Sequence, residues 1–210
     1  YLSTGLSIIP IAADGSKAPP AGVGWKAFQS QRASQEISED WFETKHFQGI
    51  AIVCGQVSGN LFVLDFELAS AFQQFAAIIE IEFPGLIKNL TVIRTPGKDQ
   101  DGGRHLYCRA QEPPRSHKLA KLTPEEAVLF NGDKHKNTLI EVKGEGGYVL
   151  APGCAAECHD SKRLYQHISG PFIDETQVLT PEQIESFLSV SRSLSHVPPE
   201  DYKPTASEKM

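Results

Sequence analysis

Two acidic residues follow a short apolar run in the segment NLFVLDFELAS, residues 60–70. Residues 61–64 read as a buried strand, because a continuous apolar run beside the turn-forming residues 58–60 is typical of one. Side chains alternate across a strand, so the carboxylates of Asp65 and Glu67 are expected on one face, about 6.6 Å apart along the backbone. Two like charges this close are unfavourable unless something positive joins them. The pair therefore predicts a shared cation.

Two further polar residues lie inside apolar strand patterns, His105 in RHLYCR and Glu141 in TLIEVKG. Mg²⁺ prefers carboxylate oxygens and keeps open positions for substrate phosphates. Two such ions about 3.5–4 Å apart can stabilise the attacking and leaving oxygens of a phosphoryl displacement. A cluster of Asp65, Glu67 and Glu141 is therefore expected to hold metal ions for phosphoryl chemistry.

The alternative reading is structural. The acids could cap loops or form ion pairs with Arg94 and Lys143, and a single histidine in a strand is more often a hydrogen-bonded core residue. Gly102 and Gly103 favour the functional reading of the histidine. Glycine lets a backbone approach a bulky anion closely, with Arg104 or the histidine as the charge partner.

Composition is that of an ordinary globular chain of 210 residues, with 40% apolar and 22% charged residues. No run of 18 apolar residues and no signal peptide occurs, so no membrane association is expected. Four cysteines are too few for a disulfide scaffold, which favours a cytoplasmic protein. The net charge of −6 excludes a generally basic nucleic-acid coat. Any such contact must be local, and residues 104–121, with five cations and one acid, are the candidate segment.

Elements that must position these residues follow from periodicity and turn signals. Helices early in the chain alternate with strands, whereas later strands pair as hairpins, which favours an α+β fold with mixed or antiparallel sheets. A capping box of Thr180, Pro181 and Gln183 predicts a C-terminal helix. Residues 110–137 are expected to be irregular. The expected helices are 36–47, 69–83 and 180–194, and the expected strands are 6–11, 49–55, 61–67, 89–95, 104–109, 138–144, 148–153 and 163–169, with hairpins at 89–109 and 138–153.

The segments VLDFE, TPGKDQDGGRHLYCR and IEVKGEGGYVLAPG, in this order and with these gaps, carry a family resemblance. They resemble the acid-x-acid, histidine and third acidic motifs of the bifunctional primase-polymerase (prim-pol) branch of the archaeo-eukaryotic primase superfamily. The earlier KAPPAGVGW resembles a basic, proline-containing stretch of that family that leads to Gly-Trp. The resemblance covers roughly residues 5–190 and implies a primase-like catalytic core of mixed or antiparallel sheets flanked by helices, with an RRM-like element.

The resemblance also implies roles for individual residues. Asp65 and Glu67 match the metal ligands of the first motif, and Glu141 matches the acid of the third, with two Mg²⁺ or Mn²⁺ ions as the implied cofactors. His105 matches the histidine that contacts the triphosphate of the incoming nucleotide.

One position departs from the pattern. The wider superfamily often has serine two residues before the histidine, where this chain has Gly103. A backbone N–H there, or Arg104, is expected to take over the contact. Lys17 and Lys143 are further candidate phosphate contacts.

The function implied is that of a DNA primase/polymerase domain that makes primers de novo and extends them by two-metal nucleotidyl transfer, in replication of a mobile element, plasmid or phage. Its partners are a single-stranded DNA template and NTP or dNTP. Residues 1–195 form the catalytic domain, and residues 196–210 are expected to link it to a helicase domain. The alternatives are a repair or translesion polymerase without priming, a non-catalytic replication-initiator module that binds DNA, and a metal-dependent nuclease.

Two other groups of residues receive structural interpretations. Cys154, Cys158 and His159 are zinc's preferred ligand types, but no second Cys/His pair of matching spacing follows, so zinc is not expected. Trp25 and Trp41 are expected in the core rather than as stacking platforms for bases.

Overall fold

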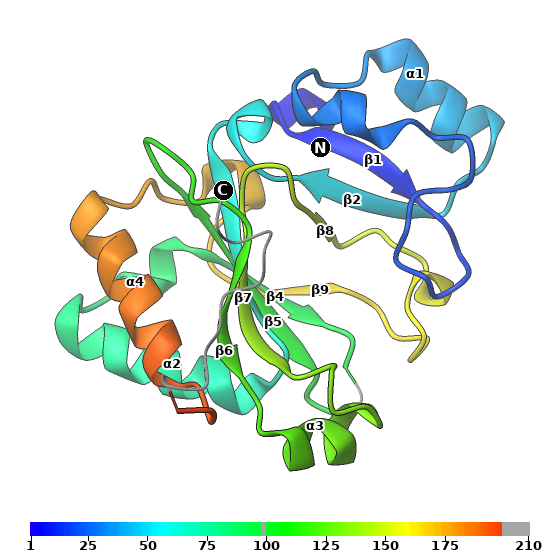
Figure 1. Cartoon of the computed structure of the whole chain (residues 1–210). Coiled ribbons are helices and arrows are strands. Elements are labelled where there is room, and N and C mark those ends of the chain that lie inside the picture. The colour runs from blue at the N-terminus through cyan, green and yellow to red at the C-terminus, as the bar shows by residue number, and fades with distance from the viewer. Residues whose placement is uncertain (98–99, 199–210) are drawn as a thin grey trace.

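The computed structural model describes residues 1–97 and 100–198. A six-stranded sheet of order β6-β7-β3-β5-β4-β9 has helices on one face and a three-stranded sheet of order β1-β2-β8 on the other (Figure 1). All strand pairings within both sheets are antiparallel among these residues, which confirms the α+β class. No helix in the described ranges is long and apolar enough to cross a membrane.

The strands are β1 (Ser7–Ile11), β2 (Gly49–Val53), β3 (Leu61–Phe66), β4 (Thr91–Thr95), β5 (Gly103–Arg109), β6 (His117–Lys121), β7 (Thr138–Lys143), β8 (Tyr148–Leu150) and β9 (Gln166–Ser169). The helices are α1 (Gln35–Glu39), which continues as a π-helical turn at Asp40–Thr44, α2 (Ala69–Glu82), α3 (Pro124–Asn131) and α4 (Pro181–Ser193).

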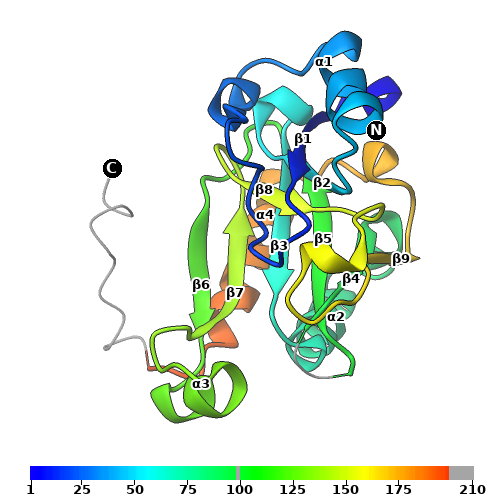
Figure 2. The same ribbon diagram turned by 90° about the vertical axis from the view of Figure 1, so that its right-hand side faces the viewer.

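Strand β3 belongs to two hydrophobic cores, because successive side chains point to opposite faces. Leu64 and Phe66 pack in the core that includes α2 and α4, whereas Leu61 and Val63 pack in the core that includes the small sheet. Asp65 is next in this second series. The carboxylate therefore lies on the face toward the small sheet, where it lines a cavity. Figure 2 shows the small sheet in front of the upper part of the large sheet.

The centre of the large sheet follows a β-α-β-β-α-β order. Strand β3, helix α2, strands β4 and β5, helix α3 and strand β7 succeed one another, with β6 inserted before α3. This order is the split β-α-β arrangement and matches the expected RRM-like element. Helix α4 lies beside α2 on the helical face (Figure 1).

The predicted C-terminal helix is confirmed, including its capping box between Thr180 and Gln183. Residues 110–137 were expected to be irregular, and this was wrong, because they contain β6 and α3. Helix α3 begins with the same signal as α4: Thr123 caps it, a proline follows, and Glu126 completes the capping box. The sequence therefore held the information for this helix.

The hairpin expected at residues 89–109 is confirmed by the β4–β5 pairing, but the one expected at 138–153 is wrong. Strand β7 pairs with β3 and β6, whereas β8 pairs with β2 in the other sheet. Ile140 belongs to the helix-side core and Val149 to the core under the small sheet. The chain between them crosses from one sheet to the other through Gly144, Gly146 and Gly147, and a Cβ at Gly144 would lie 1.6 Å from a backbone oxygen.

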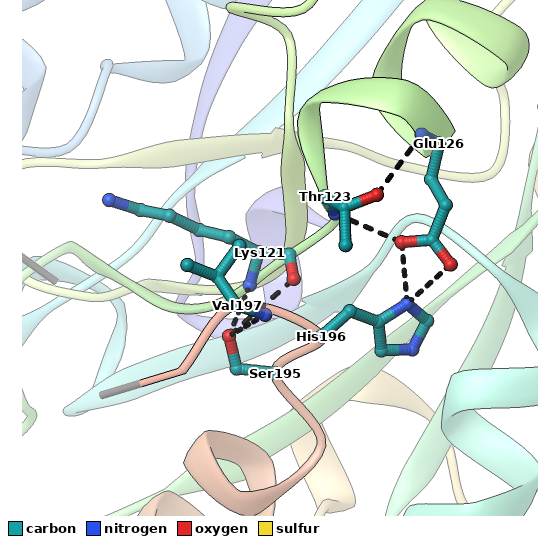
Figure 3. A network of polar contacts seen from close by, with 6 residues as sticks. All are labelled: Lys121, Thr123, Glu126, Ser195, His196 and Val197. Atoms are coloured by element: carbon teal, nitrogen blue, oxygen red, sulfur yellow. Dashed lines mark hydrogen bonds and ion pairs between the residues drawn. The ribbon is translucent and has the colours of Figure 1, made fainter. Parts of the chain in front are cut away.

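The segment after α4 is anchored to the β6–α3 junction (Figure 3). The backbone N–H of His196 donates to the carbonyl of Lys121 at 2.9 Å, and its Nδ1 lies 2.8 Å from Oε2 of Glu126. The Ser195 hydroxyl accepts from the N–H of Lys121. The expected linker, residues 196–210, thus begins in an anchored segment, and its residues 199–210 lie outside the described part of the chain.

Candidate active site

Three carboxylates converge on one point of the large sheet. Asp65 on β3 and Glu141 on β7 are direct partners in the antiparallel register, so their side chains share a face. Glu67 lies just beyond the end of β3 and returns to the same face. One carboxylate oxygen from each of the three residues lies within 4.8 Å of the others. The predicted convergence of these acids is confirmed.

His105 stands on the other side of Asp65. The two residues are register partners between β5 and β3, and Nε2 of the imidazole lies 3.5 Å from Oδ1 of the carboxylate. The ring is 5% exposed and packs against Tyr165, with the ring centroids 5.9 Å apart. Its Nδ1 has no hydrogen-bond partner among the described residues. A buried nitrogen without a partner is costly, so the site favours a ligand that supplies one.

The strand register extends this arrangement into a row. Lys118 on β6 is the register partner of Glu141, which pairs with Asp65, which pairs with His105. Across four neighbouring strands, one face of the sheet therefore carries a cation, two carboxylates and an imidazole. The acids occupy the middle of this row, and the two potential phosphate-binding groups lie on opposite sides of them.

Two further lysines contribute to the charge balance of the site. Nζ of Lys143 lies 2.6 Å from Oε1 of Glu141. Burial alone would lower the pKa of Lys143, but Glu141 and the other two acids raise it above its usual value. Lys17 comes from the loop after β1 and has a left-handed backbone, with φ of 60°. Both lysines lower the pKa values of the neighbouring acids.

The acids themselves respond unequally to this environment. Burial alone would raise the pKa of Asp65, but His105 and the lysines lower it below its usual value. Burial raises the pKa of Glu67, and the charges of Asp65 and Glu141 add to the increase, so that it reaches about 7. Glu67 is therefore only partly ionised near neutral pH in the metal-free site, and a bound cation would stabilise its ionised form.

The acids line a cavity of about 490 Å³, here called the central cavity. This volume is within the usual range for small-ligand sites. Besides the acids, His105 and both lysines, its wall includes three aromatic side chains, Trp25, Tyr148 and Tyr165. Trp25 and Tyr148 form an edge-to-face pair with centroids 5.0 Å apart. The cavity thus combines oxygen ligands, cations and aromatic surface.

The family model of the bifunctional DNA primase/polymerase N-terminal domain matches residues 1–184. The chain belongs to this family. The prim-pol resemblance of the sequence motifs is thereby confirmed. No protein in the curated collection matches the chain. Membership implies DNA primase/polymerase activity of the nucleotidyltransferase type, with DNA and nucleotides as substrates.

In this primase/polymerase domain, close packing explains why position 103 is a glycine, whereas the sequence suggested a nucleotide contact through its backbone N–H. A Cβ at this position would lie 2.3 Å from the carbonyl oxygen of Phe66 and 2.7 Å from the hydroxyl oxygen of Thr95. The glycine is therefore required by close packing between β5 and its neighbours, and a serine would not fit here. Gly103 does not line the central cavity.

Arg104 does not join the other candidate phosphate contacts. It precedes His105 in β5 and so points to the opposite face of the sheet. Its Nη1 donates to the carbonyls of Asp101 and Gly103, at 2.7 and 2.8 Å, and it is absent from the wall of the central cavity. This geometry does not support the expected triphosphate contact through Arg104.

Cys54, Cys154 and Cys158 lie in the core near the small sheet, and Cys108 lies in the helix-side core. Cys154 and Cys158 are buried, and the thiol of Cys154 exchanges hydrogen bonds with the backbone of Ile50. His159 faces Asp160, at 2.8 Å from Nδ1 to Oδ1. Among the described residues, the side chains that lie close enough together to hold a metal ion are Asp65, Glu67 and Glu141.

The three aromatic side chains in the wall of the central cavity were not predicted from the sequence. Trp41 is buried as expected, but Trp25 is half-buried and lines the central cavity. Its position after the KAPPAGVG segment, which also supplies Lys17, was the available signal. Tyr148 and Tyr165 gave no signal, because tyrosines in strand patterns are common in cores.

Proposed function

We propose that this domain is a template-directed DNA primase/polymerase that starts chains de novo and extends them. The observation that carries the proposal is the convergence of Asp65, Glu67 and Glu141 beside His105 in a chain of the primase/polymerase family. Each of these side chains comes from one of the family's three motifs. The central cavity is large enough for a nucleotide.

The three carboxylates fit a pair of divalent ions. Mg²⁺ and Mn²⁺ prefer oxygen ligands, and the oxygens here lie within 4.8 Å of one another. Asp65, Glu67 and Glu141 would hold the ions. When bound, such ions supply neutralisation of the charge that develops on the attacking oxygen and on the leaving phosphates.

The remaining residues of the cavity bind and orient the nucleotide. His105 lines the cavity, with its Nε2 facing Asp65, and would contact a phosphate of the nucleotide. Lys17 and Lys143 supply positive charge beside the acids and would attract the triphosphate. Trp25 lines the same cavity and is the side chain on which a base would stack.

Residues 1–195 would form the catalytic unit, with a helicase domain as the partner in the full-length protein. The anchoring of residues 195–197 beside α3 would fix the point at which a following segment leaves the domain (Figure 3). Tethering to an unwinding partner would raise the local concentration of single-stranded template. Replication of a mobile element, plasmid or phage is the setting that the family resemblance suggests.

The test is nucleotide incorporation with labelled nucleotides, Mg²⁺ or Mn²⁺, and an unprimed single-stranded template. We expect primers from the wild-type domain and a loss of roughly 10²- to 10³-fold or more in the Asp65→Ala/Glu67→Ala variant, because the charge stabilisation of the transition state is removed. Glu112→Ala is the control, since this acid is exposed and outside the cavity.

The same assay separates the alternatives. Extension of an annealed primer without synthesis on the unprimed strand would indicate a repair or translesion polymerase. DNA binding without any incorporation would indicate a non-catalytic module. The double variant is expected to stay folded, because removal of the buried and repelled carboxylate of Glu67 offsets the loss of the contact between Asp65 and His105.

A further inference from the structure

Lys17 has an unusual backbone conformation in the wall of the central cavity. Its φ of 60° lies in the left-handed region, which residues with a side chain rarely adopt. Such a conformation persists only where the surroundings fix it, and it is found most often at functional sites. The charge of Lys17 reaches the acids, since it lowers the pKa values of Asp65 and Glu67. The backbone of this loop residue therefore determines where a charge of the site stands.

The chain on either side of Lys17 is fixed by backbone contacts. The N–H of Ala12 donates to the carbonyl of Ala18 at 2.9 Å, and the N–H of Ala18 donates to the hydroxyl oxygen of Ser16 at 3.2 Å. Ser16 also forms an isolated antiparallel bridge with His159 in the loop between β8 and β9. None of these contacts involves the carbonyl group of Lys17.

That carbonyl is held by a side chain from a distant part of the sequence. The hydroxyl of Tyr148 donates to it, with 3.1 Å between the two oxygens. Tyr148 is the first residue of β8 and the register partner of Val53 on β2, so its backbone belongs to the small sheet. Its ring lies edge-to-face against Trp25, with centroids 5.0 Å apart. A strand and an aromatic contact thus hold the hydroxyl in place against the loop.

We propose that Tyr148 is a positioning residue for the incoming nucleotide and acts through Lys17. The inference rests on the proposed function, in which Lys17 attracts the triphosphate. Lys17 is exposed, and an exposed lysine has many rotamers, so a fixed backbone restricts the space that its ammonium group can reach. With its carbonyl held by Tyr148, Lys17 stays beside the acids before the nucleotide binds. Less conformational entropy is then lost on binding.

Tyr148→Phe separates the hydroxyl from the ring, because it removes the contact with Lys17 and keeps the aromatic surface of the cavity. Tyr1→Phe is the matched control. The hydroxyl of Tyr1 also donates to a backbone carbonyl, that of Pro152 at 2.9 Å, but Tyr1 is not part of the cavity wall. The two variants therefore lose the same kind of hydrogen bond at different places.

The first experiment measures the order of the loop and needs neither nucleotide nor catalysis. NMR relaxation of the metal-free domain gives the order parameter of the Lys17 amide. We expect a value of about 0.85 in wild type and in Tyr1→Phe, and a value below about 0.7 in Tyr148→Phe. Unchanged order parameters along β2 and β8 would show that the variant is folded. An unchanged value at Lys17 in Tyr148→Phe would overturn the proposal.

The second experiment is a double-mutant cycle in nucleotide incorporation. We expect Tyr148→Phe to raise KM for the incoming nucleotide roughly three- to tenfold and to leave kcat within about twofold. In a Lys17→Ala background the same substitution should change KM by less than about twofold, because the hydroxyl acts through the lysine. An effect of full size in both backgrounds would show that the hydroxyl acts on the nucleotide directly and would overturn the proposal.

The failure of this proposal is distinguishable from the failure of the proposed function. If the wild-type domain makes no product, the proposed function fails. The order parameter of Lys17 and the same cycle in the Kd for ATP with Mg²⁺, measured by titration calorimetry, then still decide whether Tyr148 positions the lysine. Additive effects of the two substitutions on this Kd would overturn the proposal, whereas non-additive effects would support it.

Discussion

At the scale of single residues, Asp65 and Glu67 differ in the charges of the side chains around them. Asp65 has an imidazole on one side and Glu141 on the other, whereas Glu67 has chiefly like charges and burial. A carboxyl group therefore has a lowered pKa at Asp65 and a raised one two residues later, at Glu67. Substitution of His105 should therefore affect ligand binding, whereas substitution of Glu67 should affect the pH dependence of stability.

His105→Ala should weaken nucleotide binding much more than template binding. A triphosphate contact is local, whereas affinity for a template is spread over many phosphates. We expect KM for the nucleotide to rise roughly tenfold or more and the Kd for single-stranded DNA to change by less than about twofold. Steady-state kinetics and fluorescence anisotropy measure the two quantities. His167→Ala, an exposed histidine on β9, is the control, and equal losses in both quantities would assign His105 a structural role.

Glu67→Gln should stabilise the metal-free domain above neutral pH. The folded pKa of Glu67, about 7, is higher than its ordinary value of 4.5, so the folded state binds more protons than the unfolded state between these values. This group therefore makes the domain less stable as the pH rises from about 4.5 to 7. We expect the variant to exceed wild type by roughly 2 kcal/mol at pH 8 and to match it near pH 4, as urea unfolding in EDTA would show. The same pH dependence in both proteins would contradict the assignment.

At the scale of elements, the strands place the chemistry and the close packing between them constrains the sequence. Strand β5 carries His105 and is packed so closely against β3 that Gly103 cannot carry a side chain without displacing Phe66. Because Phe66 is the residue after Asp65, any such displacement is passed to the acidic cluster. The glycine is thus tied to the geometry of the site although it does not line the cavity.

Gly103→Ala should destabilise the domain by about 1–3 kcal/mol, the usual cost of overpacking. The clash involves backbone and is therefore hard to relieve. The denaturation midpoint in urea is the measurement. Gly24→Ala is the control, because a Cβ there meets nothing within 4 Å and its φ of −77° is ordinary. If both variants unfold at the same urea concentration, β5 is less tightly packed against β3 than the structure indicates.

At the scale of the whole molecule, positive charge at the central cavity contrasts with the negative net charge of the chain. The chain has a net charge of −6, yet Lys17 and Lys143 line the central cavity. The cations of residues 104–121 do not act as one patch. Arg109 donates to the carbonyls of Ser58 and Gly59, whereas Lys118 is the register partner of Glu141 on β7. Few phosphates of a DNA strand can therefore be neutralised at once.

Residues 1–210 alone should bind single-stranded DNA weakly, with a Kd in the micromolar range or above at physiological salt. The slope of log K against log salt should correspond to about two to four phosphate contacts, which is roughly −1.5 to −3 for a single strand. A fluorescence titration across a salt series measures both. Nanomolar affinity with a steep slope would show that the domain needs no tethered partner to hold its template.

The sequence by itself determined the identities of the three acids and of His105, the α+β class, and helices such as α2 and α4, because these depend on local signals: strand alternation, capping boxes and motif order. Helix α3 was equally determined by its capping box and was overlooked. What only the tertiary structure decided is which strands are neighbours. The register that sets Lys118, Glu141, Asp65 and His105 in one row, and the crossing of the chain between β7 and β8 into different sheets, depend on pairings between distant segments. Such pairings are selected by the burial of both faces of the sheet together, and this energy is not present in any single segment.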